Sequence, residues 1–120
     1  MNAAPIGFFD SGVGGLCIRD AVRALLPAED TVYIADSANC PYGSRPPAEV
    51  RELARGHVRT LLAKGCKMVV VACNTATAAA IDALRDEWPD VPFVGMEPAV
   101  KPAALQSKSG VVGVLATEGT

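Results

Sequence analysis

The sequence predicts an α/β protein in which helices flank a parallel sheet. Short β-rich segments alternate with amphipathic segments of helical period along the 120 residues. One β-rich segment, residues 67–72, contains the continuous apolar run Met-Val-Val-Val-Ala, which is typical of a strand buried on both faces. Half of the residues are hydrophobic and a fifth are charged, so the chain can form a core. Strands that alternate with helices of this length form parallel β-α-β units with right-handed crossovers.

The first third of the chain predicts two strands and one helix. Residues 5–9 form a short apolar strand, and the run Asp-Ser-Gly-Val-Gly-Gly after it indicates a glycine-rich loop. Residues 16–26 have one apolar and one polar face and precede Pro27, so they predict an amphipathic helix that ends there. Residues 31–35 are β-rich and predict the second strand.

The middle of the chain predicts a long loop, two helices and the strand between them. Residues 36–47 are rich in turn-forming residues. Residues 47–64 carry apolar side chains on one face, and Gly65 is placed to cap this helix at its C-terminus. The third strand, residues 67–72, leads through Cys-Asn-Thr into an Ala-rich helix that runs to about Trp88.

The last part of the chain predicts two more strands. Residues 92–95 form a fourth short strand, residues 98–106 a weaker helix, and residues 111–116 a fifth strand. The predicted order is therefore β-α-β-α-β-α-β-α-β. No repeat, low-complexity segment or change of composition marks a linker.

Charge and composition exclude several classes of function. The 11 basic and 13 acidic residues give a net charge of −2, whereas nucleic-acid binders normally carry a basic excess. Aromatic residues make up 5% of the chain, too few for a base-stacking surface. No apolar run reaches the ~18 residues that span a bilayer, and the N-terminus lacks the features of a signal peptide. We therefore expect a soluble, cytoplasmic protein that binds neither nucleic acid nor membrane.

The four cysteines predict free thiols rather than disulfides or metal ligands. There is no CxxC pair and a single histidine, His57, so the spacing of a closed zinc site is missing and we expect no metal. Cys17 and Cys66 fall on a helix face and at a strand entrance, where we expect them to fill the core. Cys40 lies in the polar loop, where its side chain can be exposed to solvent. We expect His57 at the surface or at its boundary.

Polar residues follow the predicted strands. Because ligands bind beyond the carboxyl ends of the strands in an open parallel sheet, these residues form a candidate site at one rim. In chain order they are Asp10, Ser11, Asp36, the loop Pro41-Tyr42-Gly43, Cys73, Asn74, Thr75, Glu97 and Thr117.

Cys73 is the most informative of these residues. It lies between a buried strand and the start of a helix, where the helix N-terminus favours a thiolate and free amides can hold a carboxylate. A buried structural cysteine is an equally open interpretation. Asp10 can accept a proton, hold an amine or cap a helix. Tyr42 is either a ligand contact or a turn aromatic, and Thr117 either a ligand contact or a helix cap.

Several known motifs do not fit. Cys17 stands where the third glycine of a dinucleotide fingerprint belongs, and no Gly-Lys-Ser/Thr ending marks a phosphate loop. No arginine follows Cys66 or Cys73 at the spacing of the cysteine phosphatases. A papain-like hydrolase needs a histidine to activate its thiol, and we expect His57 to lie away from the rim.

Four stretches of the sequence resemble the N-terminal part of the glutamate racemases. They occur in the order of that family and are residues 6–16 (IGFFDSGVGGL), 41–45 (PYGSR), 70–78 (VVACNTATA) and 113–120 (GVLATEGT). The Asp-Ser-Gly-Val-Gly-Gly opening is the feature that separates this group from the aspartate and hydantoin racemases of the same superfamily.

The resemblance implies a cofactor-independent racemase that interconverts L- and D-glutamate for peptidoglycan, and so serves cell wall biogenesis and cell shape. It makes Cys73 one of two acid/base thiols, with Asp10 assisting it. It implies glutamate as the small-molecule partner and allows a homodimer. The substrate contacts that it implies are Asp10, Ser11, Pro41, Tyr42, Gly43, Asn74, Thr75 and Thr117.

The resemblance also implies that these 120 residues hold half of a site. The second catalytic cysteine of the family belongs to a later segment, and the family fold has two similar α/β domains with the site between them. We expect residues 1–97 to form most of the first domain and residues 98–120 to begin the second. The chain alone is then expected to be an inactive fragment, with an amino-acid-binding half-site module or a related cysteine-based racemase as alternatives.

Overall fold

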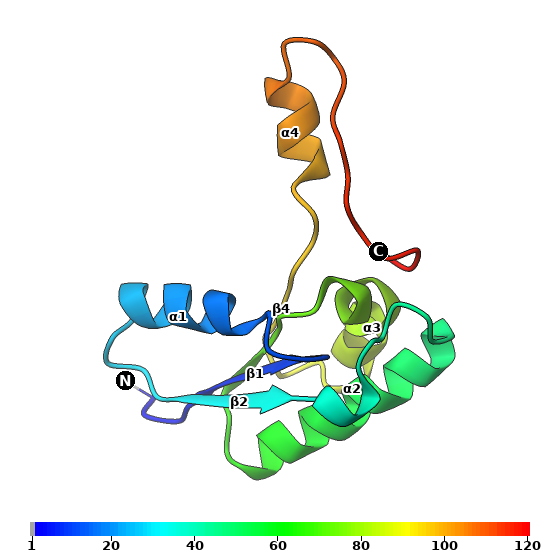
Figure 1. Cartoon of the computed structure of the whole chain (residues 1–120). Helices are drawn as coiled ribbons and strands as arrows, with labels where there is room; N and C mark the ends of the chain where they lie inside the picture. Colours follow the sequence, from blue (N-terminus) through cyan, green and yellow to red (C-terminus); the bar gives the residue numbers. More distant parts are fainter. Residues whose placement is uncertain (1) are drawn as a thin grey trace.

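A single parallel sheet forms the centre of the protein, as the sequence predicts (Figure 1). The computed structural model describes residues 2–120. The strand order is β2-β1-β3-β4, so β1 and β3 are central. The strands are β1 (Ile6–Asp10), β2 (Thr31–Ala35), β3 (Met68–Val71) and β4 (Phe93–Gly95).

Helices cover both faces of this sheet (Figure 1). The helix α1 lies on one face, and α2 and α3 pack together on the other. A short 3-10 turn, η1 (Ser37–Asn39), interrupts the loop after β2. The helices are α1 (Leu16–Leu25), α2 (Pro47–Ala63), α3 (Asn74–Glu87) and α4 (Val100–Gln106). Within residues 2–120, none of the helices combines the length and the apolar character that a membrane crossing requires.

The two faces of the sheet are buried to different degrees. Successive side chains of a strand point to opposite faces, so Phe8 faces α1 while its neighbour Phe9 faces α2 and α3. Fully buried residues of α2 and α3, such as Leu61 and Leu84, complete the larger core. The helix α1 has no buried residue among its ten, so its face of the sheet is the more open one.

The strand predicted at residues 111–116 is wrong. This segment runs extended but pairs with no strand among residues 2–120, and the apolar side chains of Val111 and Leu115 are exposed. Figure 1 shows α4 and the following segment standing away from the sheet before the chain returns to α3. Extended backbone becomes a strand only when a neighbour accepts its hydrogen bonds, and the composition of the segment does not reveal whether that neighbour is there. The other predicted strands are confirmed, and Gly65 follows the end of α2 with a φ of +80°.

Candidate active site

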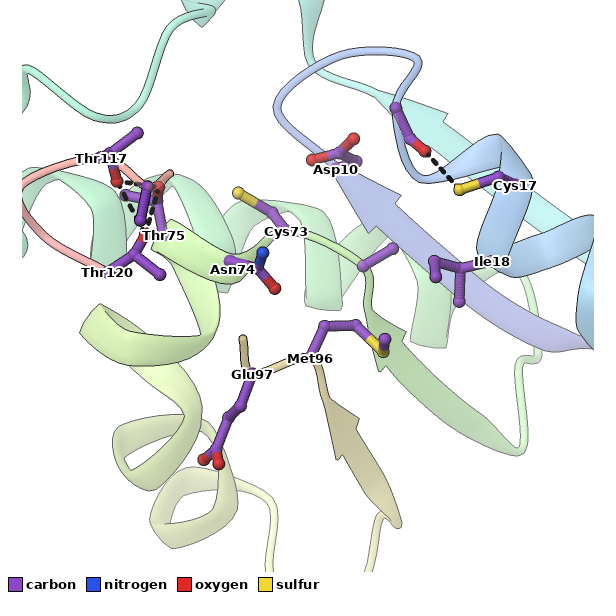
Figure 2. Close-up of a pocket in the computed structure, with 13 residues that line it drawn as sticks. Asp10, Cys17, Ile18, Cys73, Asn74, Thr75, Met96, Glu97, Thr117 and Thr120 are labelled. Atoms are coloured by element: carbon purple, nitrogen blue, oxygen red, sulfur yellow. Dashed lines mark hydrogen bonds between the residues drawn. The ribbon is translucent and has the colours of Figure 1, made fainter. Parts of the chain in front are cut away.

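A cavity of about 510 Å³ opens at the carboxyl ends of the strands (Figure 2). Its walls come from the glycine loop after β1, the start of α3, the residues after β4 and the terminal segment. The residues that line it are Asp10, Gly14, Cys17, Ile18, Ala72, Cys73, Asn74, Thr75, Met96, Glu97, Ala116, Thr117 and Thr120. The structure therefore brings six residues of the predicted rim to one cavity: Asp10, Cys73, Asn74, Thr75, Glu97 and Thr117.

Asp10 closes the glycine loop and also faces the cavity. One carboxylate oxygen accepts from the backbone N–H of Ser11 at 2.7 Å, and the other accepts from that of Gly15 at 2.8 Å. The second contact is to Gly15, the N-cap residue of α1, so Asp10 holds the start of this helix without being its N-cap. A Cβ on Gly15 would come within 2.8 Å of both the Ala72 side chain and the Tyr33 hydroxyl, which explains the glycine there. Burial and the nearby charge of Asp10 raise the pKa of Tyr33 to about 12.

Cys73 is the N-cap residue of α3. Its sulfur accepts from the backbone N–H of Ala76 at 3.4 Å and lies 3.8 Å from the Ser11 hydroxyl, which it contacts as donor. The residue is 6% exposed, and Figure 2 shows it between Asp10 on one side and Thr75 on the other. The sulfur therefore lies at the N-terminus of a 14-residue helix. Ser11 therefore reaches the site by contacting Cys73 and Asp10 rather than by lining the cavity.

Three threonine hydroxyls join the terminal segment to the start of α3. The Thr75 hydroxyl lies 2.8 Å from that of Thr117 and 3.2 Å from that of Thr120, and the last two are 2.7 Å apart. Asn74, one residue before, is exposed at the mouth of the cavity (Figure 2). Side-chain hydroxyls, an amide and free helix N–H groups thus share one wall, and such groups bind carboxylates.

The Pro41-Tyr42-Gly43 loop does not line the cavity. Pro41 is exposed, and Tyr42 is buried with its hydroxyl directed to Asp36. Gly43 lies under the terminal segment, because a Cβ there would come within 2.6 Å of the Thr117 side chain. The loop therefore forms the layer behind the cavity wall.

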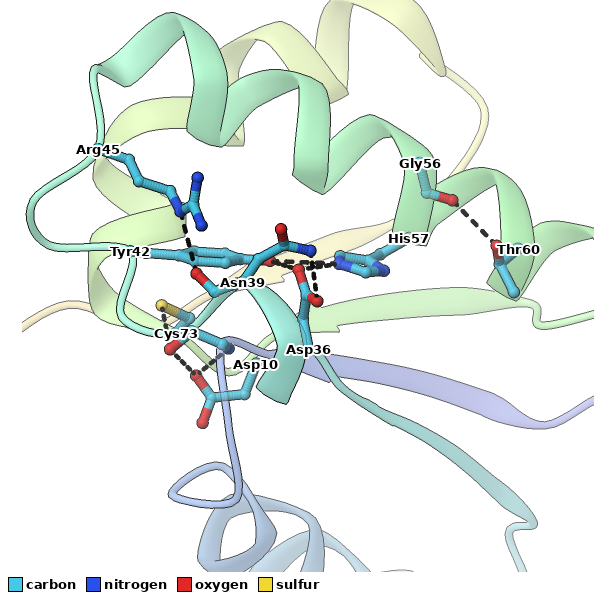
Figure 3. A network of polar contacts seen from close by, with 10 residues as sticks. Asp10, Asp36, Asn39, Tyr42, Arg45, Gly56, His57, Thr60 and Cys73 are labelled. Atoms are coloured by element: carbon cyan, nitrogen blue, oxygen red, sulfur yellow. Dashed lines mark hydrogen bonds and ion pairs between the residues drawn. The ribbon is translucent and has the colours of Figure 1, made fainter.

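A polar cluster behind Cys73 was not predicted (Figure 3). We call Asp36, Asn39, Tyr42 and His57 the Asp36 cluster. One oxygen of the Asp36 carboxylate accepts from the Tyr42 hydroxyl at 2.5 Å and from His57 Nε2 at 2.8 Å, and the other accepts from Asn39 at 2.8 Å. Burial alone would raise the pKa of Asp36, but these hydrogen bonds outweigh it and hold that pKa below its ordinary value. Burial and the neighbouring Asp36 raise the pKa of Tyr42 strongly.

The expectation that His57 lies away from the rim is wrong. Its ring meets the carboxylate that follows β2, and the ring centroids of His57 and Phe9 are 5.5 Å apart. The helical period indicates the face of α2 but not the contact with Asp36, because residue 57 shares the face that carries Val50, Ala54 and Leu61. The expectation of a position at the boundary of the surface is confirmed, because the side chain of His57 is 19% exposed.

The cysteine expectations are confirmed in part. Cys40 is exposed and Cys66 is buried, and burial raises the pKa of Cys66. The expectation that Cys17 fills the core is wrong, because Cys17 is exposed and lines the cavity. Ile18 and Val22 face the sheet, and Cys17 lies about 100° around the helix from Ile18. Among residues 2–120 no three His, Cys, Asp or Glu side chains form a group that could hold a metal ion.

The geometry suits proton transfer at a carbon next to a carboxylate. A thiol stands at a helix N-terminus, a carboxylate stands near it, and carboxylate-binding groups lie on the adjoining wall. Ile18 and Met96, which the sequence did not point to, add an apolar side to the cavity. Apolar surroundings strengthen the electrostatic interactions between a bound charge and these groups.

Comparisons with known proteins identify the family of the chain. Residues 16–120 match the family model described as Asp/Glu/Hydantoin racemase. The chain is 58% identical over 120 residues to a glutamate racemase of Roseiflexus sp. and 56% identical over 118 residues to one of Stutzerimonas stutzeri. It spans 44% and 45% of the length of these two relatives, less than half.

The chain is also similar to solved structures of glutamate racemases. The crystal structure of Escherichia coli glutamate racemase in complex with L-glutamate and the activator UDP-MurNAc-ala superimposes with a TM-score of 0.88 at 42% identity, covering 97% of this chain and 44% of that one. Glutamate racemase from Thermus thermophilus in complex with β-chloro-D-alanine gives a TM-score of 0.75 at 49% identity, covering 85% of this chain and 38% of that one.

Proposed function

The chain belongs to the Asp/Glu/hydantoin racemase family, and from this we propose that it provides one half of the active site of a cofactor-independent glutamate racemase. The observation that carries the proposal is the Cys73 thiol at the start of α3, beside Asp10 and Ser11 and open to a cavity with carboxylate-binding groups. The identity of more than 50% to relatives named glutamate racemase favours glutamate as the substrate.

In the proposed reaction, Cys73 as thiolate removes the proton from Cα of glutamate. A base must lie within hydrogen-bond reach of the proton that it removes, and Cys73 borders the cavity in which the substrate would lie. A second thiol returns a proton to the opposite face of the carbanion, so that the configuration inverts and no electrons are gained or lost. The relatives, of which the chain spans 44% and 45%, have further length that can supply this second thiol.

We assign the remaining groups of the cavity to binding. Asn74, Thr75 and the first N–H groups of α3 would hold a carboxylate of the substrate, and Thr117 would add a hydroxyl. Asp10 would assist Cys73, and Ser11 would orient the thiol. The layer formed by Pro41, Tyr42 and Gly43 would shape the wall behind them. The product, D-glutamate, would serve peptidoglycan synthesis in the cytoplasm.

The test replaces the matched segment of the Roseiflexus glutamate racemase with this chain. The chimera is incubated with L-glutamate in D2O, deuterium at Cα is followed by NMR, and D-glutamate by chiral chromatography. We expect activity in the chimera and a loss of about 10²–10⁴-fold for Cys73→Ser, the range typical of a removed acid/base group. Cys40→Ser, which removes an exposed thiol outside the cavity, is the matched control and should keep the activity.

Three outcomes would contradict the proposal. Activity that survives Cys73→Ser would overturn the assignment of the base. Binding of glutamate by calorimetry without exchange at Cα would make the chain an amino-acid-binding module instead. Exchange at Cα of another amino acid but not of glutamate would assign the chain to a related cysteine-based racemase.

A further inference from the structure

The Asp36 cluster connects the core of α2 to the wall behind Cys73. The backbone N–H of Asp36 donates to the carbonyl of Asp10 at 2.9 Å, so the carboxylate is anchored to the end of β1. The side chain of Asp36 is 6% exposed, and that of His57, which donates to it, is 19% exposed. A hydrogen bond to a charged group contributes more to stability than one between neutral groups, so each donor to this buried carboxylate matters.

The protons of this cluster have one consistent arrangement. The strongly raised pKa of Tyr42 keeps its hydroxyl protonated, so Tyr42 donates to Asp36. His57 Nε2 faces the same carboxylate oxygen and therefore carries a hydrogen, which it directs to Asp36. The contact of 3.2 Å between His57 Nε2 and the Tyr42 hydroxyl closes the triangle. Each of the three side chains is thus fixed by the other two.

The Tyr42 ring lies between this hydrogen-bonded arrangement and the Cys73 thiol. Tyr42 and Cys73 belong to the same buried cluster, and a negative charge on Cys73 adds to the causes that raise the pKa of Tyr42. Figure 3 shows the Tyr42 ring between the Asp36 and His57 pair and Cys73. On its other side Cys73 meets the Ser11 hydroxyl. Cys73 therefore shares its buried cluster with Tyr42 and contacts Ser11 through its sulfur.

We infer that His57 is a positioning residue for Cys73: by completing the hydrogen bonds of Asp36 it holds Tyr42 as a rigid wall against the thiol. The inference rests on the proposed function only in that it takes Cys73 as the base. Arg45, the charged residue next to the cluster, cannot replace His57 in this role, because it donates to the carbonyl of Asn39 and to Glu49 rather than to Asp36. Without His57 the Asp36 carboxylate keeps its charge but loses the hydrogen bond from Nε2. The Tyr42 hydroxyl then bonds to a carboxylate that is held less firmly.

The test compares His57→Leu with His57→Gln. Leucine fills the volume without a donor, whereas the side-chain amide of glutamine can donate to Asp36 in place of Nε2. In the 120-residue chain, the rate of alkylation of each cysteine by iodoacetamide is measured by mass spectrometry at one pH. We expect His57→Leu to slow alkylation of Cys73 about fivefold, the size of one lost hydrogen bond. We expect His57→Gln to restore most of the rate. The exposed Cys17, on α1, is the internal reference and should react at an unchanged rate.

The chimera with the Roseiflexus relative provides the second measurement. There His57→Leu should lower kcat and leave KM within about twofold, because the hydrogen-bond partners of His57 are Asp36 and Tyr42, which do not line the cavity. An unchanged or faster alkylation of Cys73 in a folded His57→Leu variant would overturn the inference. If alkylation slows as expected while the chimera shows no racemisation, the positioning role stands and the proposed function fails.

Discussion

At the scale of the residue, Asp36 makes stability depend on pH. Its pKa lies below the ordinary value of 3.8, because the hydrogen bonds from Tyr42, His57 and Asn39 outweigh the effect of burial. A carboxyl whose pKa is lowered by folding stabilises the folded state above its unfolded pKa. That contribution is lost as the pH falls through the folded pKa.

Asp36→Asn tests this contribution. At about pH 7 we expect the variant to lose about 1.5–3 kcal/mol of unfolding free energy, the range for a hydrogen bond to a charged group. The difference from the wild-type protein should shrink as the pH falls below about 4, where the unfolded carboxyl takes up its proton. Urea denaturation between pH 2 and pH 7 measures it, and Asp90→Asn, at an exposed carboxyl, is the control. A difference that stays constant across this range would contradict the assignment.

Some residues of the site could be predicted from the sequence, and others could not. Asp10, Cys73 and Asn74 could be predicted because each ends or follows a strand, and the carboxyl ends of parallel strands meet at one rim. The burial of Tyr42 and the contact between His57 and Asp36 could not be predicted in the same way. They depend on how far α2 lies over the sheet, which local sequence does not specify.

At the scale of the element, the hydroxyl of Thr77 holds three elements at the site together. It donates toward the carbonyls of Cys73 at 2.9 Å and Val71 at 3.3 Å, and it accepts from the backbone N–H of Met96 at 3.0 Å. These contacts join the end of β3, the first turn of α3 and the residue after β4. Thr77 is 3% exposed, so water does not replace them.

Thr77→Val should therefore destabilise the protein. The methyl group leaves the N–H of Met96 without its acceptor, and a buried unsatisfied group costs about 1–3 kcal/mol. Thr60 is the matched control, because its hydroxyl also bonds to a carbonyl four residues earlier in a helix but is exposed. We expect Thr60→Val to change the unfolding free energy by less than about 0.5 kcal/mol. Equal effects of the two substitutions in urea denaturation would show that Thr77 acts only within its own helix.

Elements were predicted well where periodicity and a partner both lie within the sequence. The strand β3 could be predicted from its continuous apolar run and the helix α2 from its apolar face. The segments that bury them belong to the same 120 residues. The segment 111–116 has the same β-rich composition as β2, yet no strand among residues 2–120 pairs with it. Whether a neighbouring strand is present does not depend on the residues of this segment. Composition alone therefore predicted a strand where the structure has none among residues 2–120.

At the scale of the whole molecule, two parts differ in how they are buried. The sheet with α1, α2 and α3 holds the buried residues of the core, whereas Leu105, Val111 and Leu115 are 78%, 78% and 104% exposed. The threonine hydroxyls and the contact between Gly43 and Thr117 tie the terminal segment to α3 and its neighbouring loop. We propose on this basis that residues 1–97 form the first domain and that residues 98–120 begin a second.

Deletion of residues 98–120 tests this division. Because the apolar side chains of the segment stay in water, we expect the remaining chain to keep the far-UV circular dichroism of its sheet and of α1, α2 and α3, without that of α4. We expect it to lose only about 1–2 kcal/mol, from the hydroxyl contacts of Thr75. Thr75→Val in the full chain removes the same contacts without removing the segment, so it should lose a similar amount in urea denaturation. The deletion should also weaken glutamate binding, because Ala116, Thr117 and Thr120 leave the cavity wall. Unfolding of the shortened chain while Thr75→Val stays folded would place the segment inside the first domain, since only packing of residues 98–120 against the sheet could produce that difference.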